Sequence, residues 1–156
     1  MKGSAKICLI TGATSGIGMA TAIGLAKLDY HIVFTTISIE EGEKTKKAII
    51  SKTLNPKVDF IKCDLSSFDD VKKCCSIFKA QYSRLDVLIN NAGVLIFKRE
   101  ESLDGIEKTF TINYLTVQLI IILLLGELKS TSGSRIINLS SGSHQLAKIQ
   151  AWATGH

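Results

Sequence analysis

The sequence predicts an α/β fold with a doubly wound parallel sheet of about five strands in the order 3-2-1-4-5. Short apolar runs alternate with longer helical patterns along the chain, which is typical of right-handed β-α-β crossovers. The runs are also continuously apolar, as at residues 7–10 and 87–89. Continuous apolar strands are expected when helices cover both faces of a parallel sheet.

The first half of the chain predicts two strands and two helices. Residues 6–11 form the first apolar run, and a helical pattern follows at residues 16–28, directly after a glycine-rich turn. Residues 31–36 are rich in β-branched and aromatic side chains, which favours a strand. Residues 40–53 form an amphipathic helical pattern with lysines on its solvated face.

The second half continues the alternation. Residues 57–62 and 85–90 are predicted strands, and an amphipathic helix at residues 68–82 connects them. Residues 103–129 are predicted to form one long helix. A fifth strand is predicted at residues 135–140.

Size and composition indicate one folded domain. The chain has 156 residues, 46% of them apolar and 21% charged, with a single proline. This composition excludes intrinsically disordered and collagen-like classes. We expect one domain over residues 1–147 and a C-terminal tail at residues 148–156.

Membrane spans, secretion and nucleic-acid binding are not expected. The first apolar run is too short for a signal peptide. Residues 119–125 are seven apolar residues, far fewer than the roughly 18 of a membrane-spanning helix, so this stretch is interpreted as a buried helix. The formal net charge is +5, but the lysines are dispersed over helix faces without interleaved aromatic residues, which argues against a nucleic-acid partner.

The four cysteines show no metal-binding or disulfide pattern. Cys8, Cys63, Cys74 and Cys75 lack CxxC spacing and lie in predicted strands or helices. A disulfide framework or zinc site is therefore not expected. Reduced thiols fit a cytoplasmic location, which we predict for the chain.

A glycine-rich segment with the sequence TGATSGIG, residues 11–18, follows the first strand and opens the first helix. Glycines let the backbone approach a phosphate closely, and the N–H groups at a helix start favour a pyrophosphate. No Gly-Lys-Ser/Thr follows, so the segment does not indicate ATP or GTP hydrolysis. It predicts a ligand site at the carboxyl ends of the strands.

This segment and four later motifs resemble the short-chain dehydrogenase/reductase family. The family's TGxxxGIG signature is at residues 11–18, its acidic residue after the third strand is Asp64, and its NNAG motif is at residues 90–93. The resemblance covers residues 5–147 and implies a Rossmann-type dinucleotide-binding domain. The residues that it implies for binding NAD or NADP are Thr11, Gly12, Ser15, Gly16, Ile17, Gly18, Asp64, Leu65, Asn91, Ala92 and Gly93. Asn91 could also tie neighbouring strands together.

The retinol-dehydrogenase-like branch of the family implies two catalytic residues. The sequence LDGIE at residues 103–107 leads to Asn113, which belongs to the catalytic group of that branch. The run RIINLSS matches the branch's fifth strand and places the catalytic serine, which hydrogen-bonds the substrate oxygen, at Ser141. Asn113 lies in the predicted long apolar helix, where burial would require hydrogen bonds. His144 is interpreted as a loop residue.

The family's catalytic tyrosine and lysine are missing from the chain. In the family, the tyrosine transfers a proton to or from the substrate oxygen, and a lysine four residues later lowers the pKa of its phenol. None of the three tyrosines here has a lysine at that spacing, and 15 residues follow Ser141. The resemblance therefore implies truncation before the YxxxK motif, as an isoform, an incomplete gene model or a fragment.

The resemblance implies an NAD(P)-dependent oxidoreductase acting on alcohol or carbonyl groups of a lipophilic substrate such as a retinoid or steroid, inactive as this chain. The alternative is a non-catalytic dinucleotide-binding or partner-binding module. Cofactor choice depends on the end of the second strand, where an acid would bind the ribose 2′-hydroxyl and an arginine a 2′-phosphate. Ile37 and Ser38, which stand at this position, are neither acidic residues nor arginines. Because an acid is absent, the sequence slightly favours NADP.

The fifth strand is expected at the edge of the sheet, because no sixth strand is predicted after it. Its apolar residues Ile136, Ile137 and Leu139 would then be exposed. We therefore expect a homo-oligomer or aggregate that forms through this edge.

Overall fold

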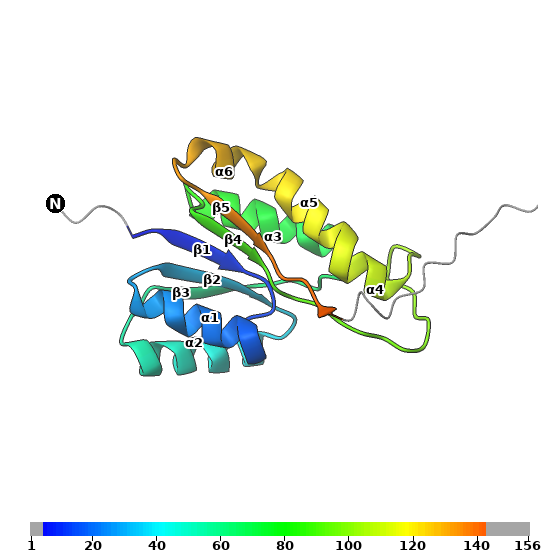
Figure 1. Ribbon diagram of the computed structural model, residues 1–156, viewed down its shortest axis with the longest axis horizontal. Coiled ribbons are helices and arrows are strands. Elements are labelled where there is room, and N and C mark those ends of the chain that lie inside the picture. Colours follow the sequence, from blue (N-terminus) through cyan, green and yellow to red (C-terminus); the bar gives the residue numbers. More distant parts are fainter. Residues whose placement is uncertain (1–4, 143–156) are drawn as a thin grey trace, which may run out of the picture.

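Five parallel strands form a sheet in the order β3-β2-β1-β4-β5, which confirms the predicted order (Figure 1). The computed structural model describes residues 5–142, so His144 and the predicted tail at residues 148–156 lie outside the described part. Each observed strand falls within its predicted range. The strands are β1 (Ile7–Ile10), β2 (His31–Thr36), β3 (Val58–Lys62), β4 (Val87–Asn90) and β5 (Arg135–Asn138).

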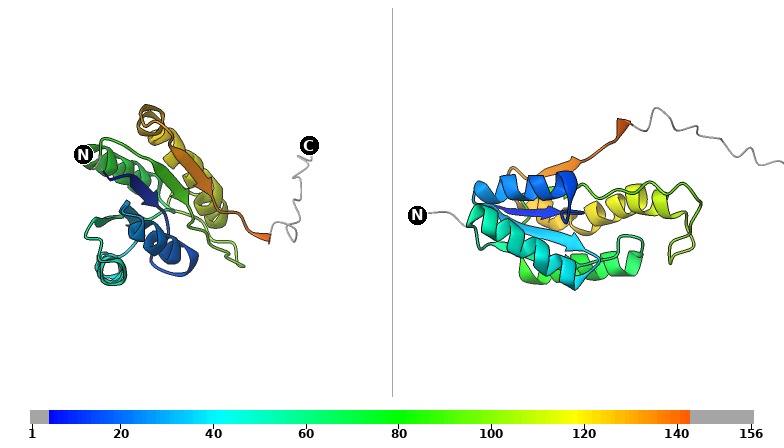
Figure 2. Two further views of the ribbon diagram at one scale, coloured as in Figure 1. Left: turned by 60° about the vertical axis from the view of Figure 1, so that its left-hand side comes forward. Right: turned by 90° about the horizontal axis from the view of Figure 1, so that it is seen from below.

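Helices cover both faces of this sheet, as the continuous apolar strands predict (Figures 1 and 2). One face carries α1 (Gly16–Lys27) and α2 (Ile39–Thr53). The other carries α3 (Phe68–Gln81), α5 (Thr116–Leu123) and α6 (Leu125–Ser130). The fold is therefore a three-layer α/β arrangement.

Each face of the sheet has its own hydrophobic core. Successive side chains of a strand point to opposite faces, so neighbours in β1 enter different cores. Ile10 packs with Phe34 and Ile49 in the core on the α1 and α2 side, whereas Leu9 packs with Phe78 on the α3 side. Burial on both faces explains why β1 is apolar at every position.

The predicted long helix at residues 103–129 is wrong in its start and its continuity. The helical segment begins at α4 (Lys108–Phe110), continues through the π-helical η1 (Thr111–Leu115) into α5, and is interrupted at Leu124 before α6. The start is delayed because Gly105, with φ +73°, turns the chain, and the Glu107 carboxylate then accepts hydrogen bonds from the N–H groups of Thr109 (2.9 Å) and Phe110 (2.6 Å).

The prediction that residues 119–125 form a buried helix is also only partly correct. Ile120 and Leu124 are buried, but Ile122 is 66% exposed.

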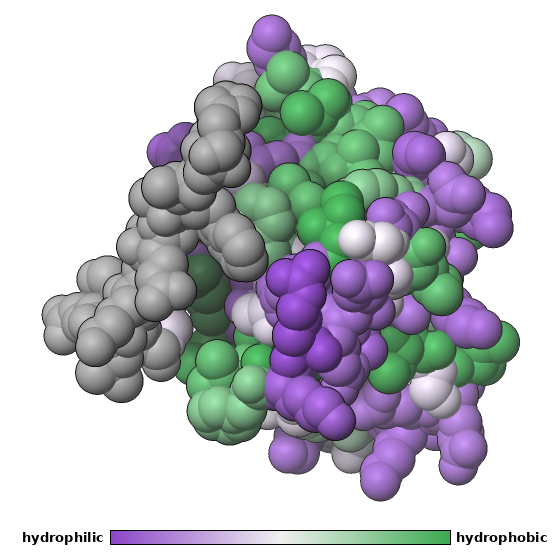
Figure 3. Space-filling view, turned by 90° about the vertical axis from the view of Figure 1, so that its right-hand side faces the viewer, coloured by the Kyte–Doolittle hydropathy of each residue, from purple (hydrophilic) through white to green (hydrophobic). Residues whose placement is uncertain are grey.

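Seen from the carboxyl ends of the strands, hydrophobic side chains gather over the upper centre of the molecule (Figure 3). Within residues 5–142, no helix has the length and apolar character needed to cross a membrane.

Strand β5 lies at the edge of the sheet, as predicted. It pairs with β4 on one side, and all four of its residues are exposed. The apolar side chains Ile136, Ile137 and Leu139 are each 40–45% exposed. The described part of the chain therefore presents an apolar strand edge to solvent.

Candidate functional site

An open cleft of about 1470 Å³ lies at the carboxyl ends of the strands. The loops after all five strands contribute to its lining. In a doubly wound sheet, ligands bind at this edge, where the connections diverge to opposite faces. The cleft therefore lies where the sequence predicts a ligand site.

The glycine-rich segment forms the part of the cleft wall next to α1. Gly12 and Gly16 have φ values of +67° and +52°, a backbone region that favours glycine. Ser15 precedes α1, and its side chain makes no capping hydrogen bond, so it does not occupy the N–H groups at the helix start. These groups and the helix dipole can receive an anion.

Two glycines are required by close packing beneath this loop. A Cβ atom on Gly12 would lie 2.9 Å from the Ala92 Cα atom. A Cβ atom on Gly18 would collide with the Gly12 carbonyl oxygen and the Asn91 Nδ2 atom. The loop after β1 therefore lies directly against the loop after β4.

Thr11 and Asn91 join these two loops by reciprocal hydrogen bonds. The Asn91 Nδ2 group donates to the carbonyl oxygens of Thr11 (2.9 Å) and Gly12 (2.8 Å). The Thr11 hydroxyl accepts from the N–H groups of Asn91 (3.1 Å) and Ala92 (3.0 Å). Thr11 is buried and does not line the cleft, unlike the other predicted binding residues. It supports the loop from beneath.

Asp64 and Leu65 lie in the loop after β3. The Asp64 Oδ1 atom accepts hydrogen bonds from the Ser66 N–H (2.8 Å) and hydroxyl (2.7 Å), which closes a tight turn. The Leu65 carbonyl accepts from the Thr116 hydroxyl (2.7 Å), which ties this loop to α5. Both predicted residues line the cleft.

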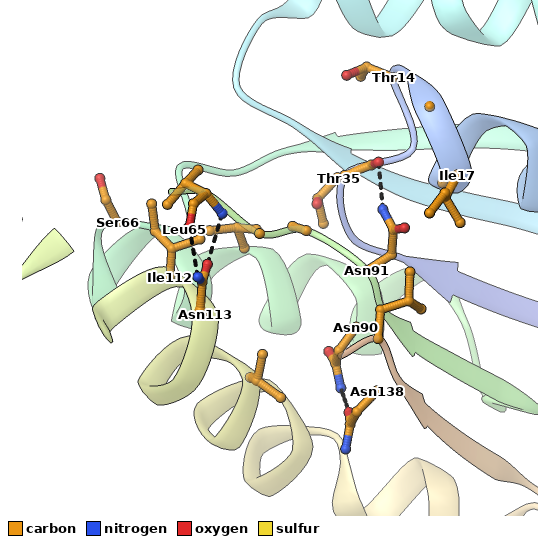
Figure 4. Close-up of a pocket in the computed structure, with 18 of the residues that line it drawn as sticks. Thr14, Ile17, Thr35, Leu65, Ser66, Asn90, Asn91, Ile112, Asn113 and Asn138 are labelled. Atoms are coloured by element: carbon orange, nitrogen blue, oxygen red, sulfur yellow. Dashed lines mark hydrogen bonds between the residues drawn. The ribbon is translucent and has the colours of Figure 1, made fainter. Parts of the chain in front are cut away.

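Asn113 lies in the π-helical turn η1 and faces the loop after β4 (Figure 4). Its Oδ1 atom accepts from the Val94 N–H (2.9 Å), and its Nδ2 group donates to the Val94 carbonyl (2.8 Å). Asn113 makes these hydrogen bonds although its side chain is exposed on the cleft wall and not buried in an apolar helix. Its hydrogen bonds hold the chain after Gly93 in place.

The end of β5 brings Ser141 to the same cleft. Ser141 is exposed and lines the cleft together with Asn113. At the last residues of the two strands, Asn90 Nδ2 donates to Asn138 Oδ1 (2.8 Å), which joins the ends of β4 and β5 (Figure 4). The buried Asn90 Oδ1 atom has no hydrogen-bond partner in the described part of the chain.

In the described part of the chain, three charged residues line the cleft: Glu41, Asp64 and Lys108. Sequence reasoning missed Glu41 and Lys108. Lys108 pairs with Glu100 (Nζ to Oε2, 3.4 Å), whereas Glu41 has no ion-pair partner among the described residues. The signal for Glu41 was its place in the first turn of the helix after the second strand. In residues 5–142, no three metal-ligating side chains lie together.

Comparison with protein families agrees with this geometry. Residues 6–153 match the family model described as short chain dehydrogenase. The chain is 35% identical to human polyprenol dehydrogenase over 148 residues, which are 92% of this chain and 45% of that protein. It is 37% identical to bovine retinol dehydrogenase 12, over 93% of this chain and 46% of that protein. The chain thus spans about half the length of the curated relatives it matches.

Solved structures show the same fold. A metagenomic short-chain oxidoreductase, solved in complex with NADP, superimposes with a TM-score of 0.75 at 27% identity, over 87% of this chain and 62% of that one. The Pseudomonas aeruginosa RhlG/NADP active-site complex gives a TM-score of 0.75 at 26% identity, over 96% of this chain and 59% of that one.

Proposed function

Because the chain belongs to the short-chain dehydrogenase family, we propose that it forms the dinucleotide-binding part of an NAD(P)-dependent oxidoreductase. The observation that carries the proposal is the cleft beside the start of α1, where the glycine-rich segment meets the NNAG segment. Gly12 and Gly18 allow no Cβ atom, and the resulting close approach forms the narrow cradle that a pyrophosphate requires. The residues present therefore fit a dinucleotide.

The glycine segment and the loop after β3 would hold the dinucleotide. The N–H groups of residues 16–18 would bind the pyrophosphate, because they start α1 without a side-chain cap. Asp64 and Leu65 would contact the adenine. Asn91, Ala92 and Gly93 would border the bound cofactor, with Asn91 held by its hydrogen bonds to the glycine segment. When bound, the cofactor supplies or accepts a hydride.

Ser141 and Asn113 would act on the substrate side. The Ser141 hydroxyl would donate a hydrogen bond to the substrate oxygen. Asn113 would fix the cleft wall through both of its hydrogen bonds to Val94. The 156 residues contain no tyrosine followed by lysine four positions later, so we propose that on their own they bind cofactor without useful turnover.

The substrate class is supported by the relatives. Human polyprenol dehydrogenase and bovine retinol dehydrogenase 12 are named for polyprenol and retinol. We propose a lipophilic alcohol or carbonyl compound for the complete site. The alternative is a non-catalytic dinucleotide-binding or partner-binding module, and the exposed edge of β5 supports its partner-binding form.

A reducing, cytoplasmic compartment is part of the proposal. The four cysteines are free and buried. Burial, followed by the negative charge of Asp86, raises the pKa of the Cys8 thiol well above its ordinary value, which keeps it protonated and unreactive. Buried neutral thiols of this kind fit a cytoplasmic protein.

Calorimetric titration of the chain with NAD and NADP tests the proposed function. We expect binding that Gly16→Val weakens, because position 16 has a positive φ and lies at the cleft. Gly24→Val, in the middle of α1 with open space around its Cβ position, is the matched control and should bind like the original chain. No heat with either cofactor at millimolar concentration would overturn the proposal.

A further inference from the structure

The adenosine end of the cleft carries an unusual charge distribution. It is formed by the ends of β2 and β3, with Thr35, Thr36, Ile37, Glu41 and Asp64 in its lining. Among the described residues, these two carboxylates are the charged side chains of the lining at this end. The cationic residue that the described lining contains, Lys108, comes from α4 and pairs with Glu100. Within residues 5–142, the lining at this end therefore carries negative charge and contains no lysine or arginine.

Glu41 is held at this position by the start of α2. The Thr36 hydroxyl donates to the Ser38 carbonyl (3.0 Å), and Ser38 caps the helix by accepting from the Glu41 N–H (3.4 Å). The next residue, Gly42, packs so closely on Phe60 that a Cβ atom would lie 2.6 Å from the ring. The first turn of α2 therefore lies directly against β3, and this packing places Glu41 beside the cleft.

The residues nearest to the strand end, Ile37 and Ser38, offer no positive charge to a phosphate. Ile37 is apolar and 66% exposed. The Ser38 hydroxyl oxygen accepts the helix-cap hydrogen bond from the Glu41 N–H. Glu41 and Asp64 supply the charge at this end, and it has the same sign as that of a phosphate.

We infer that Glu41 selects the unphosphorylated dinucleotide, NAD, by accepting a hydrogen bond from the ribose 2′-hydroxyl and repelling a 2′-phosphate. In doubly wound folds, an acid near the end of the second strand has this role for the 2′-hydroxyl. Here it comes from the following helix turn. The inference rests on the proposed function. The sequence-based preference for NADP depended on the absence of an acid at positions 37 and 38. Glu41 supplies an acid at this end of the cleft from the helix that follows, so that reason for preferring NADP no longer holds.

Dissociation constants for NAD and NADP, measured by calorimetry on the original chain and three variants, test this inference. Glu41→Lys reverses the charge, and Glu41→Gln removes it. Glu40→Lys is the matched control, because Glu40 is exposed in the same first turn of α2 but does not line the cleft. Both lysine variants place the same unfavourable charge at the helix start, so any loss of stability is shared.

We expect the original chain to bind NAD at least about tenfold more tightly than NADP, since like charges in a site disfavour a ligand strongly. Glu41→Gln should reduce this ratio, Glu41→Lys should abolish or invert it, and Glu40→Lys should leave it unchanged. The ratio should also shrink as salt is raised from 0.1 M to 1 M, where the Debye length falls from about 10 Å to about 3 Å.

Two different results would overturn this inference, and they can be told apart by whether the original chain binds either cofactor. If both cofactors bind but the ratio is near one, or is the same in Glu41→Lys as in Glu40→Lys, Glu41 does not select the cofactor, although the proposed function stands. If neither cofactor binds the original chain at millimolar concentration, the proposed function fails and this inference fails with it.

Discussion

Asp59 on β3 accepts a hydrogen bond of 2.7 Å from the Nε2 atom of His31 on β2, at the edge of the sheet opposite to β5. The same carboxylate accepts from Lys46 Nζ (3.0 Å) on α2 and from the Tyr82 hydroxyl (3.1 Å) at the end of α3. One carboxylate thus joins the helices on both faces to the edge strand.

The Asp59 carboxylate should stabilise the fold in a pH-dependent way. Burial alone would raise the pKa of Asp59, but the hydrogen bonds from His31 and Lys46 outweigh it and lower the pKa below its ordinary value of 3.8. The stabilisation is therefore present above pH 3.8 and is lost as the pH falls from there through the lowered value. Asp59→Asn should reduce the free energy of unfolding at pH 7 by about 1 kcal/mol, because the carboxylate is partly exposed.

Urea unfolding between pH 7 and pH 2.5 measures the difference in the free energy of unfolding between the original chain and Asp59→Asn. This difference should become smaller in acid. Asp29→Asn, which removes an exposed ion pair with Lys57, is the control and should change little at any pH. An equal effect of both substitutions would contradict the assigned role of Asp59.

Gly18→Ala should damage both the fold and the cofactor site. The new methyl group would meet the Gly12 carbonyl oxygen and Asn91 Nδ2, so the two loops must separate. We expect a loss of about 1–3 kcal/mol in the free energy of unfolding, and weaker dinucleotide binding. Gly24→Ala, in open space on the same helix, should instead stabilise by about 1 kcal/mol. Urea unfolding and cofactor titration measure these effects, and unchanged binding by Gly18→Ala would contradict the close loop contact.

The isolated chain should not reduce retinal or a steroid ketone at a useful rate. General acid–base catalysis contributes about 10²–10⁴-fold, and the loss of substrate positioning removes more. An assay that follows oxidation of NADH or NADPH by absorbance measures this. Robust turnover that Ser141→Ala abolishes and Ser140→Ala preserves would show that the residues present suffice for catalysis.

The exposed β5 edge should cause self-association. Ile136, Ile137 and Leu139 expose apolar surface beside unpaired backbone groups. Light scattering after size-exclusion chromatography should show concentration-dependent dimers or larger species. Ile137→Lys should reduce them, because a charge on an edge strand opposes pairing. Leu28→Lys, at an exposed position at the end of α1, should not. A monodisperse original chain without hydrophobic-dye binding would contradict this expectation.

The sheet could be predicted because a buried parallel strand is indicated by a continuous apolar run of a few consecutive residues. The apolar runs at β1 and β4 are unbroken, and the intervening helices dictate parallel pairing. The start of the helical segment at α4 could not be predicted from periodicity. Leu103 and Ile106 continue a helical spacing, but the positive φ of Gly105 turns the chain before the helix begins. Helix starts depend on such turn and cap geometry, which periodicity alone does not detect.

The candidate site was predictable where residues follow a strand directly. The glycine segment with Gly12 and Gly16 was found in this way, whereas Asp64 came from the family resemblance, and all three residues line the cleft. Glu41 was missed because it reaches the cleft from a helix turn, which depends on how α2 packs on β3. The exposure of Asn113 likewise depends on the position of its helix over the cleft, and a single sequence does not contain that information.

The reciprocal hydrogen bonds between Thr11 and Asn91 join residues that are 80 positions apart in the chain. During synthesis, the glycine segment emerges early, but its partners are made only after four strands and three helices. Contacts of such long sequence separation form late, because loop closure costs entropy before any contact is gained. The pyrophosphate cradle should therefore be among the last parts of the molecule to acquire its shape, so dinucleotide binding would report the completion of folding as well as the presence of a site.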